Sequence, residues 1–480
     1  MESIKKIGSM NTTNQQHIII LGGGISGLSL AWKLCERGQK VTIIERSGFV
    51  GGLAGTQSDN GHHLDFGPHS FFSEDQEILE TVLGFFRGTL EPRRRDVKFY
   101  YQGKYLNYPL KPGDVLIQMG LMQGIRAGLS FLRQKMSFAS KHDAVLTEDM
   151  TVEEWALESF GEHLYQSFFK PYTEQFWKLP CRELSASTIP SHTRTNFINT
   201  LKVLLGKRAT RQGDSLIERE QLPTYCPATG FGEIASRIAD KVQAAGGKIL
   251  VDSQVCEVEP NGEGSVLVQY QFKGKTESLA CESLISTIPL PLFIGMLKPQ
   301  PPADVRISAA RLEFLALVVL GMVTEKMDVL DSSYLYILNR PYNRISEMNK
   351  FNPGTSLPKE NIIAIEMPCL QDSLIWNASK EEIFQLSAES LARDGILLPG
   401  DVKKLLLAKT AHAYPIYRKD FAPHLKKVLA YIRSYPQLKT LGRSGEFLYT
   451  DADVCMRRAF NLATRILNTA RLHALDGTDT

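Results

Sequence analysis

The sequence predicts an α/β protein in which a discontinuous Rossmann-like domain is interrupted by a second domain of mixed α+β structure. A strand, a glycine turn, a helix and a second strand follow one another in residues 17–52. Similar strand and helix patterns return only after long segments of different character. At 480 residues the chain is also too long for one minimal core, so more than one domain is expected.

The first strand is predicted at Ile18 to Leu21, a mostly β-branched run suited to burial on both faces of a parallel sheet. Gly22, Gly24 and Gly27 follow in the pattern G-x-G-x-x-G, and Ser26 lies inside it. The first glycine allows a tight turn and the second lets backbone approach a pyrophosphate. The third lets the following helix pack closely on the sheet, so these residues predict a dinucleotide site.

The next helix and strand complete this prediction. Apolar residues recur at helical spacing up to Cys35, and Gly38 stands where a helix C-cap is expected. The strand Val41 to Ile44 then ends in Glu45, whose carboxylate suits the hydroxyls of an adenosine ribose. Because this acid would repel a ribose phosphate, NADP is disfavoured and NAD or FAD is expected.

A second glycine pair follows the acid in the pattern E-R-x-x-x-x-G-G. Arg46 and the backbone at Gly52 and Leu53 would approach the pyrophosphate from its other side, as a permanently held FAD requires. The alternative is an ordinary glycine-rich surface turn.

Strand and helix patterns divide the rest of the chain. They return at a glycine turn (230–232), a helix (233–245), strands near 248–251 and 255–258, and a last helix (453–470). We therefore assign residues 17–90, 222–292 and 410–480 to the nucleotide-binding domain, and 91–221 and 293–409 to the substrate domain. The first of the two substrate segments is expected to be helix-rich, and the second holds strands and a helix at 380–394. Residues 1–16 are expected to be a disordered lead-in.

Composition excludes several classes of function. A net charge of +3 is too small to favour nucleic acid as a partner, and seven singly placed cysteines indicate no zinc site. They suit a reducing, cytoplasmic compartment. No stretch reaches 18 apolar residues without interruption. The amphipathic segment 114–136 predicts a core-facing helix, a peripheral membrane contact or an apolar lid over the substrate.

Seven further segments carry a family resemblance. They are LDFGPHSFFSEDQEI (64–78), YQGKYLNYPLKP (101–112), LYQSFFKPYTEQFWKLPCRELSAS (164–187), YCPATGFGEI (225–234), ISTIPLPL (285–292), AYPIY (413–417) and GRSGEFLYTDADV (442–454). With them the chain resembles the FAD-dependent amine oxidase and protoporphyrinogen oxidase superfamily. Within it, the chain is most similar to the branch that contains UDP-galactopyranose mutase. The resemblance implies FAD as cofactor and a fold of the glutathione-reductase and amine-oxidase type.

The resemblance also implies where the flavin is held. The last segment matches the motif that closes over the flavin, through Gly442, Arg443, Asp451, Asp453 and Val454. Arg443 would stabilise negative charge on the reduced flavin, and the carboxylates would accept hydrogen bonds from ribityl hydroxyls. Asp is also a favoured helix N-cap, so a structural role is an alternative for both acids.

Further matches place residues at the adenine and at the flavin ring. Val255 matches the position that contacts adenine, while Gly67 and Pro68 match the loop that passes the flavin ring. His69, Trp177 and Tyr417 match positions near the flavin or substrate and are the catalytic candidates. Core packing is the alternative for the two aromatic residues, and a structural role for the histidine.

Two departures from the mutase pattern decide the functional hypothesis. The mutase loop has a second histidine where this chain has Phe72, and the mutase Y-R-S-L arginine aligns with LEFLALVV (312–319), which has no cation. Arg194 alone would be a weak clamp for a diphosphate. We therefore expect an FAD-dependent oxidoreductase that takes a hydride from an apolar or amine-bearing substrate, with O₂ or another acceptor. The alternatives are a mutase acting on a nucleotide sugar and a flavin-bound protein without turnover. The sequence leaves the substrate, general base and oligomeric state open.

Overall fold

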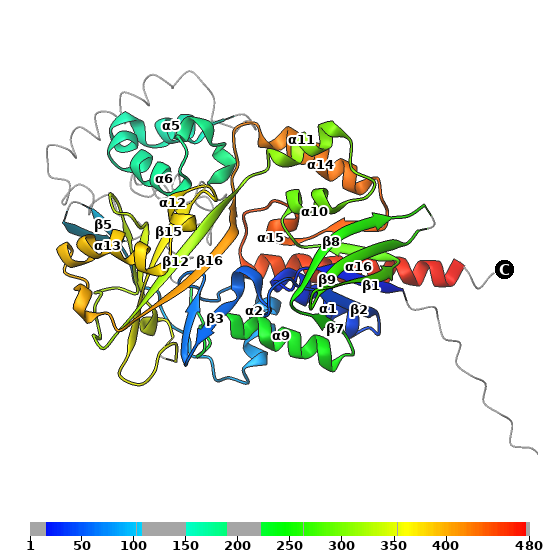
Figure 1. Cartoon of the computed structure of the whole chain (residues 1–480), viewed down its shortest axis with the longest axis horizontal. Helices are drawn as coiled ribbons and strands as arrows, with labels where there is room; N and C mark the ends of the chain where they lie inside the picture. The colour runs from blue at the N-terminus through cyan, green and yellow to red at the C-terminus, as the bar shows by residue number, and fades with distance from the viewer. Residues whose placement is uncertain are drawn as a thin grey trace, which may run out of the picture.

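The computed structural model describes residues 16–101, 103–107, 150–189, 222–262, 264–352 and 354–476. Its elements form two halves that lie side by side (Figure 1). The lead-in up to residue 15, the segment 114–136 and Arg194 lie outside the described residues. Among the helices of the described part, none is long and apolar enough to cross a membrane.

The first half is built on a five-stranded parallel sheet, which confirms the Rossmann-like prediction. Its strands, in spatial order, are β17 (Leu438–Thr440), β11 (Ser283–Ser286), β1 (His17–Leu21), β2 (Lys40–Ile44) and β7 (Lys248–Leu250). The four residues Ile18 to Leu21 have no exposed surface, as expected for a strand covered on both faces.

The two faces of this sheet pack against different layers because side chains alternate along β1. Ile18 and Ile20 pack with helices, whereas Ile19 and Leu21 pack with a three-stranded antiparallel sheet and its neighbouring helices. The first layer contains α1 (Ile25–Cys35), α2 (Gln76–Phe85), α9 (Gly232–Ala244) and α16 (Ala452–Asp476). The second contains β8 (Ser253–Pro260), β9 (Val266–Phe272), β10 (Lys275–Cys281), α10 (Leu290–Met296), α11 (Ala303–Ala310) and α14 (Phe421–Arg433).

The second half is built on a seven-stranded sheet in which the second and third strands, β12 (Phe314–Thr324) and β15 (Asn361–Cys369), are fully buried. Its strands, in spatial order, are β16 (Lys404–Pro415), β12, β15, β14 (Arg344–Glu347), β13 (Tyr334–Ile337), β5 (Val97–Tyr101) and β6 (Lys104–Asn107). Neighbouring strands are antiparallel except β13 and β5. The helices of this half are α5 (Val152–Leu164), α6 (Lys170–Trp177), α12 (Leu374–Asn377) and α13 (Lys380–Arg393).

Short elements connect the larger ones. The hairpin of β3 (Thr56–Asp59) and β4 (His62–Asp65) precedes the loop predicted at the flavin ring, and α15 (Gly442–Gly445) precedes α16. Short 3₁₀ helices span Gly52–Ala54, Cys181–Glu183, Ala186–Thr188, Met348–Lys350 and Pro399–Asp401, and a π-helical turn spans Tyr165–Phe169.

Several predicted elements are confirmed within one or two residues at their starts. The helix predicted at 233–245 is α9, and the helix predicted at 380–394 is α13. Gly38 has φ +77° just after α1, as its C-cap assignment requires. The last helix extends to Asp476, beyond its predicted end at 470.

Two features of the second half differ from the sequence analysis. β5 and β6 lie in the segment that was expected to be helix-rich. They were missed because such short strands show little periodicity outside the sheet that pairs them. β16 continues without a break through residue 410, where a domain boundary was predicted, because its whole length pairs with β12.

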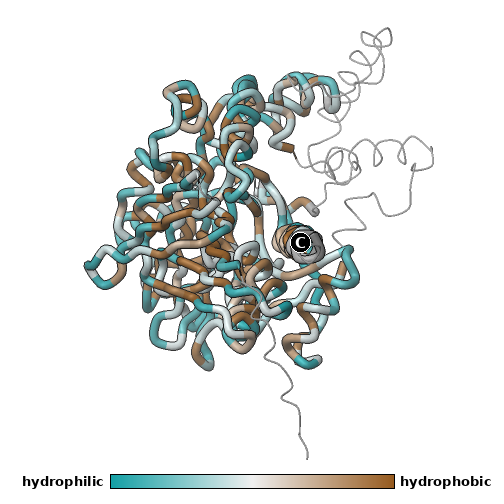
Figure 2. Tube along the Cα trace, turned by 90° about the vertical axis from the view of Figure 1, so that its right-hand side faces the viewer, coloured by the Kyte–Doolittle hydropathy of each residue, from teal (hydrophilic) through white to brown (hydrophobic). Residues whose placement is uncertain are grey.

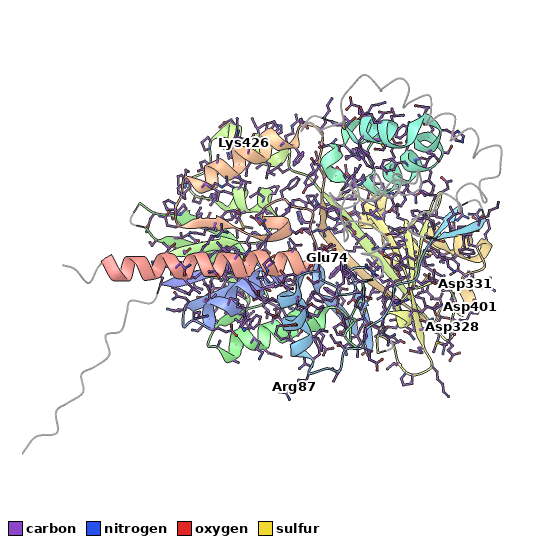
Figure 3. The ribbon with its side chains drawn as sticks, turned by 180° about the vertical axis from the view of Figure 1, so that it is seen from behind. Glu74, Arg87, Asp328, Asp331, Asp401 and Lys426 are labelled. Atoms are coloured by element: carbon purple, nitrogen blue, oxygen red, sulfur yellow. The ribbon has the colours of Figure 1, made fainter. Side chains whose placement is uncertain are left out.

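The distribution of hydropathy along the chain agrees with this layering (Figure 2). Hydrophobic segments gather in the interior and hydrophilic loops at the rim (Figure 2). Seen from behind, α16 begins at the junction of the halves, near Glu74, and runs away from it (Figure 3). Its second turn is held there by Arg457, which pairs with Asp75 at 2.6 Å.

The third glycine of the turn provides a test of the predicted close packing. A Cβ at Gly27 would overlap the carbonyl oxygen of Gly22, which is backbone and cannot turn away. We expect Gly27→Ala to lower the free energy of unfolding by about 1–3 kcal/mol. The matched control is Gly84→Ala in α2, where a Cβ meets nothing within 4 Å. It should be neutral or raise that free energy by about 0.5–1 kcal/mol. Urea unfolding of both variants measures the difference, and equal effects would contradict the packing argument.

Candidate functional site

A cavity of about 860 Å³ lies where the two halves meet. Its wall combines the turn after β1, the loop after β2, the loop after β4, the end of β16 and the start of α16. Twelve of the predicted site residues line it, namely Gly22, Gly24, Ser26, Glu45, Arg46, Gly52, Leu53, His69, Val255, Arg443, Asp451 and Asp453. The structure therefore brings together residues that are more than 400 positions apart in the sequence.

One end of the cavity is a backbone cradle made by the two glycine turns. The N–H of Gly51 donates to the carbonyl of Gly23 at 2.8 Å, and a Cβ at Gly52 would lie 3.3 Å from the Cα of Gly24. α1 begins directly after Gly24 and has no side-chain cap. Its first N–H groups and its dipole thus favour an anion such as a pyrophosphate. Gly27 is covered by the turn itself and does not line the cavity.

Glu45 is held by backbone on both of its carboxylate oxygens. The N–H of Gly23 donates to Oε2 and the N–H of Ser47 donates to Oε1, each at 2.7 Å. Each carboxylate oxygen has a further lone pair, so the fixed carboxylate can also accept from two ribose hydroxyls. Val255 and Arg46 lie on the cavity wall near it. This arrangement fits the adenosine half of a dinucleotide.

The last part of the chain closes directly on the first glycine turn. Gly442 has φ +85°, and a Cβ there would overlap the side chain of Ser26. Arg443 donates to the carbonyls of Ala413 at 2.8 Å and Thr450 at 3.2 Å. Its guanidinium carbon lies 4.9 Å from the ring of Tyr414 and 4.6 Å from that of Tyr449. The cation is therefore fixed beside the cavity without a carboxylate among these contacts.

The acids near the start of α16 differ in their surroundings. Asp453 is buried and accepts a hydrogen bond from the hydroxyl of Ser73 at 2.8 Å, which ties α16 to the loop after β4. Asp451 is exposed and precedes the first residue of the helix. Val454 is 40% exposed and does not line the cavity. The assigned contacts of these residues with a flavin remain predictions.

His69 lies on the cavity wall as a neutral ring. Burial, assisted by the positive charges of Arg344 and Arg443, lowers the pKa of His69 to about 3. Its Nδ1 is buried and has no hydrogen-bond partner among the described residues. A buried N–H without a hydrogen-bond partner costs free energy, so the neutral ring is more stable with its proton on Nε2 than on Nδ1. His69 therefore suits a hydrogen-bond donor through Nε2, and not a cationic general acid.

The residues before His69 rest on a buried ion pair. Arg344 on β14 donates through Nε and Nη2 to the two oxygens of Glu366 on β15, both at 2.5 Å. A Cβ at Gly67 would lie 3.1 Å from Oε2 of Glu366, and Gly67 has φ +126°. Burial opposes the charge of Arg344, but Glu366 raises the pKa of Arg344 well above its ordinary value. Gly67 thus packs on this pair, and neither Gly67 nor Pro68 lines the cavity.

Trp177 and Tyr417 do not line this cavity. Trp177 packs in an aromatic cluster with Phe176 and Tyr414. The hydroxyl of Tyr417 accepts from the N–H of Tyr449 at 2.7 Å and donates to the carbonyl of Phe447 at 3.2 Å. These bonds hold the segment that leads to α16. A catalytic role for either residue stays a prediction.

Other residues of the cavity wall were not found from the sequence. His412 is one of them, and burial, assisted by the charge of Arg46, lowers its pKa to about 4. Phe231, whose ring lies 5.3 Å from that of His69, is another. The AYPIY segment was noted, but the strand alternation of β16 would have been needed to extend the site back to His412.

The matched family agrees with this geometry. The family model described as flavin-containing amine oxidoreductase matches residues 25–394, so the chain belongs to that family. Its cofactor is FAD. The glycine cradle, the fixed Glu45 and the cation Arg443 at the other side fit the three parts of such a dinucleotide.

Individual relatives include both mutases and oxidases. The chain is 29% identical over 180 residues to a probable UDP-galactopyranose mutase of Klebsiella pneumoniae, a match that covers 37% of this chain and 44% of the relative. It is 29% identical over 173 residues to an L-amino-acid oxidase of Daboia russelii, a match that covers 32% of this chain and 34% of the relative. These matches span less than half of each relative. A crystal structure of reduced UDP-galactopyranose mutase shares the fold, with a TM-score of 0.77 and 17% identity. The superposition covers 95% of this chain and 94% of the mutase chain.

The lowered pKa of His69 predicts a pH effect on stability. An unfolded histidine titrates near pH 6.5. Between pH 6.5 and about 3, His69 is therefore protonated in the unfolded chain and neutral in the folded protein. Stability should fall as the pH drops through this window, by at most about 1.4 kcal/mol per pH unit from this group.

Replacing the ring isolates the effect of His69 from that of other groups. His412 acts in the same direction, whereas Asp65, whose pKa burial raises to about 7, acts in the opposite one. We expect His69→Gln holoenzyme to lose less thermal stability than wild type between pH 7.5 and 5. Parallel curves for the two proteins would show that His69 is not protected from protonation.

Proposed function

We propose that the protein is an FAD-dependent oxidoreductase that takes a hydride from a largely apolar or amine-bearing organic substrate. The observation that supports this best is the Arg344–Glu366 pair. Glu366 is 3% exposed and engages two of the guanidinium nitrogens, so the cation carries its own counter-charge. A diphosphate would need cations that are not already neutralised.

The surroundings of the pair are aromatic. Arg344 lies 5.4 Å from the ring of Tyr334 and 5.8 Å from that of Tyr336. Tyr172 of α6 contacts Tyr336 edge-on at 5.8 Å, and Phe176 contacts Tyr414 at 5.2 Å. Flat aromatic faces next to a neutralised ion pair suit a planar or apolar substrate that carries few charges.

In this proposal each residue has a limited task. Bound FAD supplies the hydride acceptor, and the chain binds the substrate, orients it and shields it from water. The Nε2–H of His69 donates a hydrogen bond into the cavity. Arg443 places a fixed positive charge beside it, which favours negative charge developing on the bound partner. Electrons leave the enzyme to O₂ or another acceptor.

A second candidate is a flavin-dependent mutase that acts on a nucleotide sugar. It is favoured by the likeness to the probable UDP-galactopyranose mutase of Klebsiella pneumoniae. The phenolic groups of Tyr414 and Tyr449 beside Arg443 are also groups that can bind phosphate oxygens. The two candidates differ in whether the substrate changes the redox state of the flavin.

Anaerobic mixing separates the two functions. We expect the oxidised holoenzyme to lose its flavin absorbance near 450 nm with at least one member of a panel of amines, porphyrinogens and polyenes. UDP-galactopyranose should cause no bleaching and, after dithionite reduction, no ring contraction. Ring contraction without any bleaching across the panel would overturn the oxidase proposal in favour of the mutase.

The ion pair offers an independent prediction. Wild-type holoenzyme should bind UDP weakly, with a Kd above about 1 mM, because Glu366 neutralises Arg344. Glu366→Gln removes the counter-charge and should tighten UDP binding about tenfold or more, measured by isothermal titration. The variant should also be less stable, since breaking a buried pair costs about 3–5 kcal/mol. Arg340→Gln, at an ion pair with Asp394 that is about as buried as the Arg344–Glu366 pair, is the control and should leave UDP binding unchanged. Micromolar UDP binding by wild type would contradict the proposal.

A further inference from the structure

A buried carboxylate in the β3–β4 hairpin is not used by any step described so far. Asp65 is 1% exposed and is the last residue of β4, two positions before Gly67. Both of its oxygens accept from the N–H of Phe231 at 3.1 Å. The hydroxyl of Thr56 on β3 donates to its Oδ1. The carboxylate therefore joins the hairpin to the residue that precedes α9.

Thr56 extends the same connection by one residue. Its hydroxyl oxygen also accepts from the N–H of Gly232 at 2.8 Å, the first residue of α9. Phe231 offers α9 no side-chain cap. Asp65 and Thr56 thus cap the helix from a distant segment and satisfy two N–H groups that a helix leaves unpaired. The fit leaves no room for side chains, because a Cβ at Gly230 would lie 2.7 Å from Oδ1 of Asp65.

The capped residue touches the candidate flavin loop. The ring of Phe231 lies 5.3 Å from that of His69, and both line the cavity. Two further contacts run in parallel between the same segments: Phe71 and Tyr225 exchange two backbone hydrogen bonds at 2.8 Å, and Cys226 Sγ donates to the carbonyl of His69 at 3.6 Å. Residues 225–231 therefore contact the loop 65–72 at three positions, namely Asp65, His69 and Phe71.

The other side of α9 reaches the pyrophosphate cradle. A Cβ at Gly51 would lie 3.3 Å from the Cβ of Ala235, one turn into the helix. A shift of the N-terminal end of α9 would thus move the wall at His69 and the cradle at Gly51 together. Asp65 and Thr56 are the side chains that fix this end.

We propose that Asp65 and Thr56 are positioning residues for the flavin, which set the cavity wall formed by His69 and Phe231 relative to the pyrophosphate cradle by capping α9. They do so without contacting the reacting atoms. The proposal concerns the binding and environment of FAD and holds for an oxidase and for a mutase alike. It does not rest on the proposed function.

Three variants and one matched control test the proposal on the full-length holoenzyme. Thr56→Val removes the hydroxyl and keeps the shape, Asp65→Asn keeps the shape and one acceptor, and Thr56→Ser keeps the hydroxyl. The control is Thr229→Val, which removes a hydroxyl bonded to Glu233 Oε2 at 2.9 Å on the exposed side of the same helix start. The measurements are the Kd for FAD after reconstitution, the visible circular dichroism of the bound flavin, its midpoint potential by dye equilibration, and the unfolding temperature.

We expect Thr56→Val and Asp65→Asn to weaken FAD binding about tenfold or more and to change the flavin dichroism and midpoint potential. Thr56→Ser should restore all three readouts, and Thr229→Val should leave them unchanged even if it lowers the unfolding temperature. If Asp65→Asn does not fold, the valine and serine variants of Thr56 decide the outcome. Thr56→Val with a lowered unfolding temperature but wild-type flavin readouts would overturn the proposal, since the cap would then serve stability alone.

Discussion

The backbone contact between the two glycine turns is the constraint on which the cavity depends. With Gly51 N–H bonded to the carbonyl of Gly23, the turn after β1 and the loop after β2 face the same space at the start of α1. A Cβ at Gly52 would lie 3.3 Å from the Cα of Gly24, so glycine lets the two turns approach closely and present backbone to a ligand's phosphates. The last segment then packs its own glycine, Gly442, on Ser26 of the same helix. Three stretches of chain are thereby fixed around one helix end.

Charge is distributed unevenly along the cavity that results. The cradle end relies on backbone dipoles and on Arg46, while the other end holds Arg443 among carbonyls and tyrosine rings. Beyond it, Arg344 is matched by Glu366 within one cross-strand pair. The positive charges of both Arg344 and Arg443 act on the His69 ring, and together with burial they lower its pKa and keep it neutral. The arrangement therefore stabilises negative charge on a bound molecule near Arg443, whereas the Arg344–Glu366 pair next to it has no net charge.

Sequence reasoning was most successful where local backbone geometry determines function. The glycine spacing, the acid at position 45 and the β-branched run at 18–21 each have one local explanation, and the parallel sheet follows from them. It was least successful for β5 and β6 and for the uninterrupted β16, since pairing partners determine those strands. Phe231 and His412 were missed for a related reason: nothing local marks a residue that reaches the site through the packing of a distant helix or strand. Trp177 and Tyr417 do not line this cavity, and sequence similarity alone could not show which family positions do.

The late position of Arg443 in the chain has a consequence for biosynthesis. The glycine cradle emerges from the ribosome within the first sixty residues, but the guanidinium and the helix start that complete the cavity follow more than 380 residues later. The nascent chain therefore carries an open half-site, with apolar β1 already made, for most of its translation. The cavity is complete only once the start of the final helix is in place, and FAD that binds the completed cavity stabilises the joining of the two ends of the protein.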